Sequence, residues 1–350
     1  DHTSMAKTLI IRLSAIGDVA MTIPIIYSVA CAHPEDAFTV LTQPFLTTLF
    51  IHRPENVTLV GVDTKGAEHS LWGVVRLALR LTHERFDRVV DLHNVIRSRA
   101  IGLVFQLRGV PVYRLDKMRR ERRALTARPP KTIRPLRPVT ERYADVFRAA
   151  GFSFSLTFVS LFAAHPVDEA VISEMAGEKT GHWVGVAPFA RHAGKIYPPA
   201  QMERVIDLLS GRGDITLFLF GGKGDEQAVL DRWAAARPQV RSMAGRYTLN
   251  QELALISRLD VLLCMDSANM HFAALVGTPV VSVWGATHPF AGFYPYGLSP
   301  EDAIQEDLDC RPCSTFGDKP CHRGDWACMT RIAPERIVRR VVERLGGVKP

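Results

Sequence analysis

Aspartate, serine and histidine side chains stand where one buried strand is expected to end. The segment reads Leu263-Cys-Met-Asp266-Ser267-Ala268-Asn-Met-His271, so an apolar run gives way to small polar residues and then to a helical pattern. The free N–H groups of a first helical turn and the helix dipole form an anion site that suits a diphosphate. His271 would lie one turn in, near enough to donate to a phosphate. The alternatives are helix capping by Asp266 and Ser267, and a hydrogen-bonded histidine in the core.

Cationic and acidic side chains follow two other expected strands in this half of the chain. After the apolar run Val184–Ala187, the loop holds Arg191 and Lys195, which can bind a phosphate through charge-assisted hydrogen bonds. The spacing is not that of a P-loop. A strand over 215–220 is followed by glycines and then by Glu226, a carboxylate able to accept hydrogen bonds from a ribose. A glycine turn between strand and helix is also common without any ligand.

An aspartate also follows the first expected strand of the chain. The sequence there is Arg12-Leu-Ser-Ala-Ile-Gly17-Asp18, with one glycine where a dinucleotide-binding loop has three. No acidic residue closes the second strand, which ends in Val40-Leu-Thr-Gln, so binding of NAD or FAD is disfavoured. An aspartate at the tip of such a loop can act as a general base. The alternative is that Asp18 only caps the following helix.

The elements that carry these residues alternate between short apolar strands and helical segments. This alternation is typical of parallel sheets covered by helices, and it restarts near His182. Strands are expected at 8–13, 38–41, 57–62, 88–92, 112–115, 183–187, 215–220, 261–265 and 280–284. Helices are expected at 24–32, with Pro24 in the first turn, and at 71–83, 99–107, 140–150, 199–212, 225–236, 249–259, 271–276 and 334–345.

We therefore expect an α/β protein with two Rossmann-like domains that face each other across a cleft. The first domain spans 5–165, the second spans 180–333, and a C-terminal helix and tail occupy 334–350. Ligands in such sheets bind beyond the carboxyl ends of the strands. The aspartates and cations described above all follow strands, so they are expected to line the cleft.

Length and composition are consistent with such a globular protein. The chain has 350 residues, of which 47% are hydrophobic and 23% charged, with a mean hydropathy of +0.03; this argues against disordered and fibrous classes. No apolar run approaches the ~18 residues that a membrane span needs, so we expect no transmembrane segment. The first four residues, DHTS, show no export signal, and we expect native sequence to begin near Met5.

Positive charge is concentrated in one part of the chain. The net charge is +7, yet residues 97–148 alone hold 15 basic and four acidic residues, a net charge of +11. Residues 128–138 combine four prolines with four cations, which predicts a loop. Such a basic band indicates an anionic partner, either a phosphate, a nucleic acid or an acidic membrane surface. The alternative is a solvated basic face.

Four of the six cysteines lie close together near the C-terminus. Cys310, Cys313, Cys321 and Cys328 fall within 19 residues, whereas Cys31 and Cys264 stand alone. Four cysteines can hold a structural zinc ion, although only the first pair has a usual C-x₂-C spacing. Disulfides and reduced, packed thiols are the alternatives. None of these readings makes the cysteines catalytic.

At these motifs the chain resembles glycosyltransferase family 9, the ADP-heptose:lipopolysaccharide heptosyltransferases. The similarity runs from Leu9 to Leu345 and rests on ordered motifs. The family's R-x-S-x-x-G-D-x-x-x-T-x-P opening, its loop lysine and its D-[TS]-G-x-x-H…G-x-P stretch are matched by Arg12, Ser14, Gly17, Asp18, Thr22, Pro24, Lys195, Asp266, Ser267, His271, Gly277 and Pro279. Ala268 stands where the family usually has glycine, and Ala187-Pro-Phe-Ala-Arg191 replaces a Thr-rich loop.

The resemblance implies a GT-B fold, with the acceptor in the first domain and the nucleotide sugar in the second. It implies an inverting transfer without a required metal, with Asp18 as general base and Lys195 on the donor's phosphate and sugar. Arg191, Glu226, Asp266, Ser267, Ala268 and His271 would complete the donor site.

The acceptor implied by the resemblance is a phosphorylated, Kdo-bearing lipid A precursor. Arg119, Arg120, Arg122 and Arg123 would bind it, which implies a cytoplasmic protein at the inner face of the inner membrane of a Gram-negative bacterium. A different GT-B nucleotide-sugar transferase or an epimerase remains an alternative, as does a family member that binds donor without catalysis. We expect no nucleic-acid partner, because no helix-turn-helix, zinc-finger or RNP pattern is present.

Overall fold

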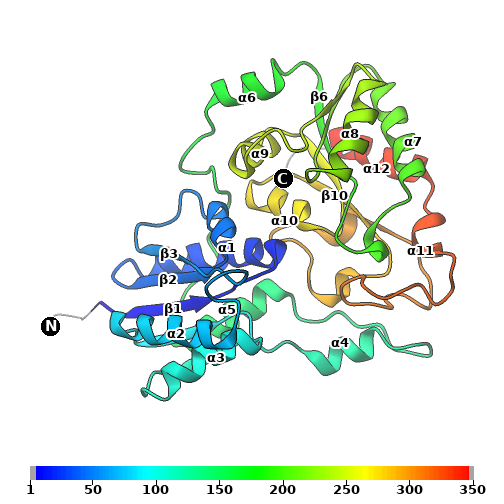
Figure 1. Ribbon diagram of the computed structural model, residues 1–350. Helices are drawn as coiled ribbons and strands as arrows, with labels where there is room; N and C mark the ends of the chain where they lie inside the picture. The colour runs from blue at the N-terminus through cyan, green and yellow to red at the C-terminus, as the bar shows by residue number, and fades with distance from the viewer. Residues whose placement is uncertain (1–4, 347–350) are drawn as a thin grey trace. The chain divides into compact units, whose positions relative to one another are not determined.

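The computed structural model describes residues 5–346, so the expectation about the first four residues lies outside the described range. The chain divides into two compact units. The first comprises the residues through Met118 together with Arg137–Val159, and the second comprises Arg119–Leu136 and the residues from Ser160 onward. Each unit is built around one parallel sheet (Figure 1).

The sheet of the first unit has the strand order β3-β2-β1-β4-β5, with every neighbouring pair parallel. Its strands are β1 (Lys7–Ile11), β2 (Ala37–Thr42), β3 (Val57–Gly61), β4 (Arg88–Asp91) and β5 (Val112–Arg114). The central strands are short apolar runs because helices cover both faces of the sheet. Because the strands are parallel, their carboxyl ends all lie at one edge of the sheet. Loops such as 12–15 leave the sheet at this edge.

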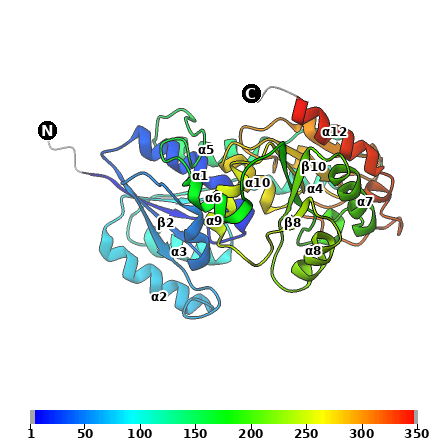
Figure 2. The ribbon, with the colours of Figure 1, turned by 90° about the horizontal axis from the view of Figure 1, so that it is seen from above.

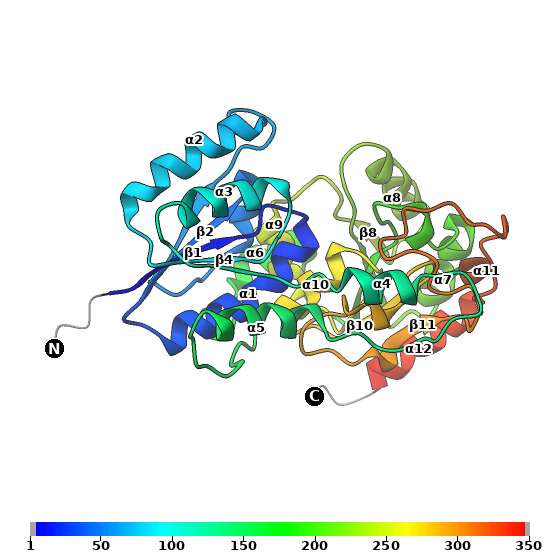
Figure 3. The ribbon, with the colours of Figure 1, turned by 90° about the horizontal axis from the view of Figure 1, so that it is seen from below.

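Helices pack on both faces of this sheet. They are α1 (Ile16–Ala32), α2 (Leu71–Leu81), α3 (Ile96–Gln106) and α5 (Val139–Ala149). The pair α2 and α3 lies on one face and the pair α1 and α5 on the other (Figure 3). α1 is long because its residues are buried almost throughout, from Val19 to Ala30.

The second unit repeats the architecture with six parallel strands in the order β11-β10-β9-β6-β7-β8. The strands are β6 (His182–Ala187), β7 (Ile215–Leu219), β8 (Val240–Ser242), β9 (Val261–Met265), β10 (Val280–Trp284) and β11 (Ala303–Gln305). All five residues of β9 and of β10 are buried, as expected for central strands of a covered parallel sheet. This strand order is that of a Rossmann fold.

The helices of the second unit also cover both faces. They are α6 (Glu169–Ala176), α7 (Pro199–Ser210), α8 (Asp225–Ala235), α9 (Leu249–Ile256), α10 (Ala268–Leu275), α11 (Ala327–Thr330) and α12 (Pro334–Gly346), with α4 (Arg119–Leu125) described below. α7, α8 and α12 contribute to one apolar core with the strands, and α9 and α10 lie on the opposite side (Figure 2). Among the described residues no helix combines the length and apolar character needed to cross a bilayer.

Residues 119–136 form a segment that we call the basic strap, and it packs with the second unit. The sequence placed these residues in the first domain, within 5–165. The guanidinium of Arg122 lies 5.7 Å from the ring centre of Phe316, and the Leu136 N–H donates to Phe290 O at 2.8 Å. Because the strap has one short helix and many prolines, such individual contacts and not an apolar face decide where it packs.

Local signals located most elements but missed several. α1 begins at Ile16, so Pro24 lies inside the helix and not in its first turn as expected. α10 likewise begins before His271, at Ala268. The short elements α4, α6, α11, β8 and β11 were not predicted, because three- to eight-residue segments carry little periodicity. Residues 128–138 form a loop, which confirms that expectation.

Candidate functional site

Asp18 is the third residue of α1, directly after the loop that leaves β1. Its Oδ2 forms an ion pair with Arg12 Nη2 at 2.6 Å and accepts a longer hydrogen bond of 3.4 Å from the Ala15 N–H. The Asp18 side chain is 24% exposed. Asp18 therefore caps the helix only in part. Its carboxylate accepts a long hydrogen bond from the N-cap amide, and its shorter contact is the ion pair with Arg12.

Arg12 anchors that carboxylate to the sheet. Its side chain is buried, and Nη1 donates to Leu92 O at 2.9 Å, just beyond the end of β4. The guanidinium binds a backbone carbonyl with one nitrogen and a carboxylate with another, and these two contacts hold both groups in a fixed geometry. Arg12 therefore connects the tip of α1 to the neighbouring strand. The sequence motif contained Arg12, but its type and position did not reveal this role.

The turn after β4 is fixed by a buried aspartate. Asp91 accepts hydrogen bonds from the N–H groups of His93 and Asn94 at 3.0 and 2.8 Å and from the Ser98 hydroxyl at 2.9 Å. Burial raises the pKa of Asp91, although these hydrogen bonds oppose the shift. Burial, followed by the charges of Arg12 and Lys117, lowers the pKa of His93 to about 3. His93 is therefore neutral at physiological pH and is not a cationic ligand.

Lys195 and Asp266 form an ion pair in the second unit. Lys195 Nζ lies 3.0 Å from Asp266 Oδ2, and the same oxygen accepts the Thr287 hydroxyl at 2.8 Å. Lys195 ends a short 3₁₀ turn after β6, Asp266 follows β9, and Thr287 follows β10. Three neighbouring strands thus deliver these side chains to one sheet edge, as the sequence predicted for the lysine and the aspartate. Thr287 was missed as a functional residue, although it lies in a motif already noted.

The start of α10 carries the predicted anion site. Ser267 is the N-cap residue with extended backbone, yet its side chain makes no capping hydrogen bond. Its Oγ is a buried atom without a hydrogen-bond partner among the residues that the structure describes. Ala268 is the first helical residue, and His271 is 7% exposed one turn later. No Ser267 side-chain cap therefore occupies the first-turn N–H groups, and the Ser267 hydroxyl makes no hydrogen bond with the described residues.

Glu226 and Arg191 occupy different environments. Glu226 is in the first turn of α8, where its Oε2 accepts the Gly222 N–H at 2.7 Å. The glycine turn thus binds this carboxylate through a backbone N–H. Arg191 is exposed on the loop between β6 and Lys195. Both follow strands of the second sheet, on the edge that also carries Lys195.

The predicted acceptor residues lie on α4. Arg119, Arg120 and Arg123 are exposed, and Arg122 is partly covered by its contact with Phe316. α4 and the segment after it lie along the second unit, close to the loop before α11 (Figure 3). The basic residues between 97 and 118 and between 137 and 148 remain in the first unit.

The clustered cysteines lie near one another as free thiols. Cys328 is buried, and Cys310, Cys313 and Cys321 are partly buried. Burial raises the pKa of Cys328 to about 11, and the neighbouring thiols add to the shift. In the described part of the chain, no three of these sulfurs lie within 4.8 Å of one another. The thiols are therefore not preassembled as a tetrahedral site.

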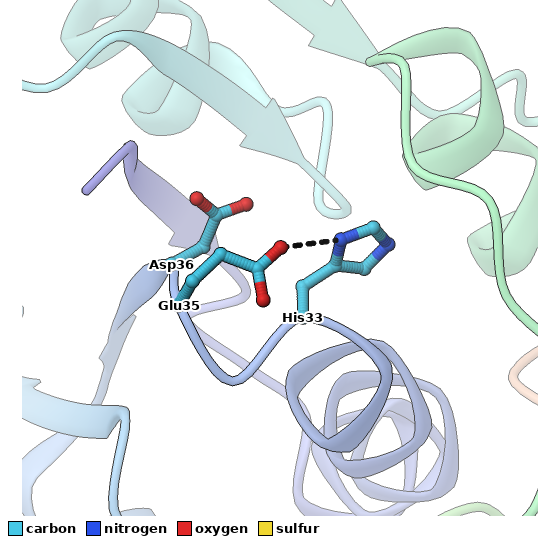
Figure 4. A group of neighbouring side chains, drawn as sticks. All are labelled: His33, Glu35 and Asp36. Atoms are coloured by element: carbon cyan, nitrogen blue, oxygen red, sulfur yellow. Dashed lines mark ion pairs between the residues drawn. The ribbon is translucent and has the colours of Figure 1, made fainter. Parts of the chain in front are cut away.

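One other group of potential metal ligands is compact. His33, Glu35 and Asp36 have ligand atoms within 4.8 Å of one another, in the turn between α1 and β2 (Figure 4). His33 Nδ1 lies 3.5 Å from Glu35 Oε1, and Nε2 lies 3.0 Å from Ser153 O. A carboxylate oxygen and a carbonyl oxygen both accept hydrogen bonds, so both ring nitrogens of His33 face acceptors. The turn precedes β2 and so lies at the amino ends of the strands, opposite Asp18.

Comparison with known proteins gives consistent matches. A model of glycosyltransferase family 9 (heptosyltransferase) matches residues 74–319. Lipopolysaccharide heptosyltransferase 3 of Escherichia coli K12 is 26% identical over 290 residues, which cover 77% of this chain and 80% of that protein. Lipopolysaccharide core heptosyltransferase OpsX of Haemophilus influenzae is 24% identical over 297 residues, covering 82% and 81%.

Solved structures share the fold over nearly the whole chain. A glycosyl transferase family 9 protein from Veillonella parvula superposes with a TM-score of 0.74 at 18% identity, covering 97% of both chains. Escherichia coli heptosyltransferase WaaC with ADP-2-deoxy-2-fluoro heptose gives a TM-score of 0.67 at 15% identity, covering 96% of this chain and 99% of that one. At these identities the likeness concerns the fold, which is the GT-B fold that the sequence predicted.

Proposed function

Because the chain belongs to glycosyltransferase family 9 and is a glycosyltransferase, we propose that it transfers a heptose from ADP-heptose to a lipopolysaccharide inner-core acceptor, Kdo-lipid A or heptosyl-Kdo-lipid A. The observation that carries the proposal is the Lys195–Asp266 ion pair, held at the carboxyl edge of the second sheet by Thr287. The names and extents of the curated relatives support the reaction class.

The donor's diphosphate binds at the start of α10. Uncapped N–H groups and the helix dipole favour an anion there, and the Ser267 hydroxyl adds an unused donor. Lys195 supplies the nearby positive charge and Asp266 accepts from sugar hydroxyls. Arg191, Ala268 and His271 line the same loops, and Glu226 accepts from the ribose once it is released from Gly222.

Asp18 acts as the general base in this reaction. It takes the proton of the acceptor hydroxyl while that oxygen forms a bond to the anomeric carbon and the bond from that carbon to ADP breaks. Attack from the face opposite ADP inverts the anomeric centre. Arg12 and Ala15 both contact Oδ2, so Oδ1 is the oxygen we assign to proton transfer. Negative charge that develops on the diphosphate is met by Lys195 and the α10 dipole.

Substitution of the base tests this assignment. Asp18→Asn should abolish transfer, measured as ADP release with ADP-heptose and a Kdo-lipid A acceptor. Binding of the ADP-sugar, measured by calorimetry, should be retained because the residues assigned to the donor site belong to the second unit, whereas Asp18 belongs to the first. Near-normal turnover would remove Asp18 from the base role. A parallel panel with UDP- and GDP-sugars identifies the donor, and turnover with one of these alone would replace ADP-heptose.

The basic strap binds the phosphorylated acceptor at the membrane. Arg119, Arg120 and Arg123 present exposed charges on α4, and Arg122 is oriented by Phe316. Each cation near an anionic bilayer contributes ~1 kcal/mol. We expect salt-sensitive binding to vesicles of anionic lipid. Binding that survives high salt, or removal of these four charges, would exclude this role of the strap, whereas a protein that binds no anionic vesicle would argue against a peripheral position at the inner face of the inner membrane.

Catalysis needs no metal in this proposal, and a zinc ion on the four clustered cysteines would be structural. Tetrahedral binding requires the sulfurs of Cys310, Cys313, Cys321 and Cys328 to draw closer than they are here. Metal analysis of protein purified without chelator decides whether the ion is present. Transfer should continue at the same rate after removal of free metal ions by a chelator.

A further inference from the structure

Three backbone segments stack against one another beneath Lys195. The Gly194 N–H donates to Gly317 O at 3.1 Å, and the Ala286 N–H donates to Gly194 O at 2.9 Å. The Cys313 N–H in turn donates to Ala286 O at 3.1 Å. A Cβ on Gly194 would lie 2.8 Å from Gly317 O, so the chains touch with no room for a side chain. The loop that carries Lys195 therefore rests directly on the cysteine-rich loop.

Arg311 ties this stack together from the inside. Its side chain is 3% exposed, and its nitrogens donate to Gly285 O at 2.5 Å and to Thr287 O at 2.9 Å. Further bonds reach Glu306 O and Gln305 Oε1. The two carbonyls on either side of Ala286 are thus held by one guanidinium. Because the Thr287 hydroxyl binds the carboxylate that pairs with Lys195, Arg311 fixes the support of that pair.

Lys131 attaches the basic strap to the same point. Its Nζ donates to Pro312 O at 2.5 Å and to Cys310 O at 3.3 Å, the carbonyls that flank Arg311. Both of these acceptors are neutral backbone carbonyls, not carboxylates. The ammonium group is partly buried, and this burial lowers the pKa of Lys131. A cation that gives its hydrogen bonds to two backbone carbonyls orients a segment and does not neutralise a charge.

We propose that Lys131 and Arg311 are positioning residues, which couple the basic strap to the Lys195–Asp266 pair through the stacked segments. A strap that is ordered by an anionic ligand keeps Lys131 on the Arg311 segment, and this segment keeps the loops of Gly194 and Thr287 in place. If one ligand already orders these segments, the second ligand binds with a smaller loss of conformational entropy. Only the identity of the two ligands rests on the proposed function.

Hydrogen exchange tests the connection without any ligand. Lys131→Met removes the two hydrogen bonds and keeps a long apolar stem. We expect faster exchange of the amides of Gly194, Ala286 and Cys313, which are distant from the substitution in sequence. The matched control is Arg134→Met, which removes the same charge three residues along from an exposed side chain. Exchange that is unchanged in Lys131→Met, or equally changed in the control, would overturn the proposal.

Ligand binding tests the consequence. In Lys131→Met we expect the Kd of ADP to rise about fivefold, a size typical of substitutions that contact neither ligand. Lys131→Arg should restore the Kd to within about twofold, since a guanidinium can donate to both carbonyls. A general loss of stability would not be rescued in this way.

The two proposals fail in different measurements. If wild-type protein does not bind ADP, the proposed donor is wrong, and hydrogen exchange still decides the role of Lys131. If ADP binds equally well to Lys131→Met and to Arg134→Met, the coupling is absent whatever the donor is. Arg311→Met would leave several buried carbonyls without donors and is unsuitable as the primary variant.

Discussion

The ion pair between Arg12 and Asp18 gives the sharpest prediction about catalysis. Arg12→Met keeps the aliphatic stem and removes both the 2.6 Å contact with Asp18 and the 2.9 Å hydrogen bond to Leu92 O. Hydrogen bonds to charged groups contribute about 1.5–3 kcal/mol each. Asp18 is 24% exposed and can recover part of its solvation from water. We expect the free energy of unfolding to fall by about 2–4 kcal/mol.

The effect on the reaction follows from geometry. Without Arg12 the carboxylate of Asp18 is held only by the long contact with the Ala15 N–H. A displacement of about 1 Å of a catalytic group can cost ~10²-fold in rate. We therefore expect kcat to fall ~10²-fold in Arg12→Met, while the Kd of ADP is unchanged because Arg12 is in the first unit.

A double-mutant cycle separates positioning from an independent role. The assay is ADP release under saturating substrates, for Arg12→Met, Asp18→Asn and the double variant. If Arg12 acts only through Asp18, the double variant is as slow as Asp18→Asn alone. Multiplicative losses would refute the reasoning and would assign Arg12 a contact of its own with substrate. Thermal unfolding of each variant confirms that the protein is folded at the assay temperature.

Three other perturbations have defined outcomes. Burial raises the pKa of Glu252 to about 7 from the ordinary 4.5. The buried carboxylate therefore does not destabilise the fold below about pH 4.5, and its destabilising effect grows as the pH rises to 7. Glu252→Gln should raise the melting temperature at pH 8 and leave it unchanged at pH 4, and an equal gain at both pH values would contradict the assigned burial. Gly194→Ala places a Cβ 2.8 Å from Gly317 O and should cost about 1–3 kcal/mol of unfolding free energy in denaturant titrations, whereas Gly346→Ala, with nothing within 4 Å, should cost little. Thr287→Val should weaken binding of the ADP-sugar in calorimetry and Thr287→Ser should not; equal binding by both would exclude the hydroxyl as a support of the Lys195–Asp266 pair.

Much of the fold could be predicted because parallel sheets leave a strong local pattern. Strands buried on both faces read as short apolar runs, and β9 and β10 were predicted with the bounds that the structure shows. α1 was predicted too short because proline is frequent in the first turn of a helix. The helix in fact begins at Ile16, and residues on both sides of Pro24 are buried. β8 and β11 have three residues each and become strands only by pairing with neighbours.

The candidate residues could be found from sequence where a strand ends in an unusual polar group. Asp18, Lys195 and Asp266 all satisfied that rule, and the structure brings the last two within 3.0 Å of each other. Thr287 and Arg311 were not found as functional residues. A threonine after a strand and an arginine between cysteines are ordinary in sequence, and their roles exist only through contacts with distant segments.

The sequence by itself determined the family, the two-sheet architecture and the chemical types available at the strand ends, because these depend on local periodicity and ordered motifs. Only the tertiary structure decided where the basic strap belongs. Charge along the chain assigned it to the first half, whereas Lys131, Arg122 and Leu136 bind it to the second unit. Charge density is a property of neighbours in sequence, and packing is decided by which carbonyls and rings those side chains reach.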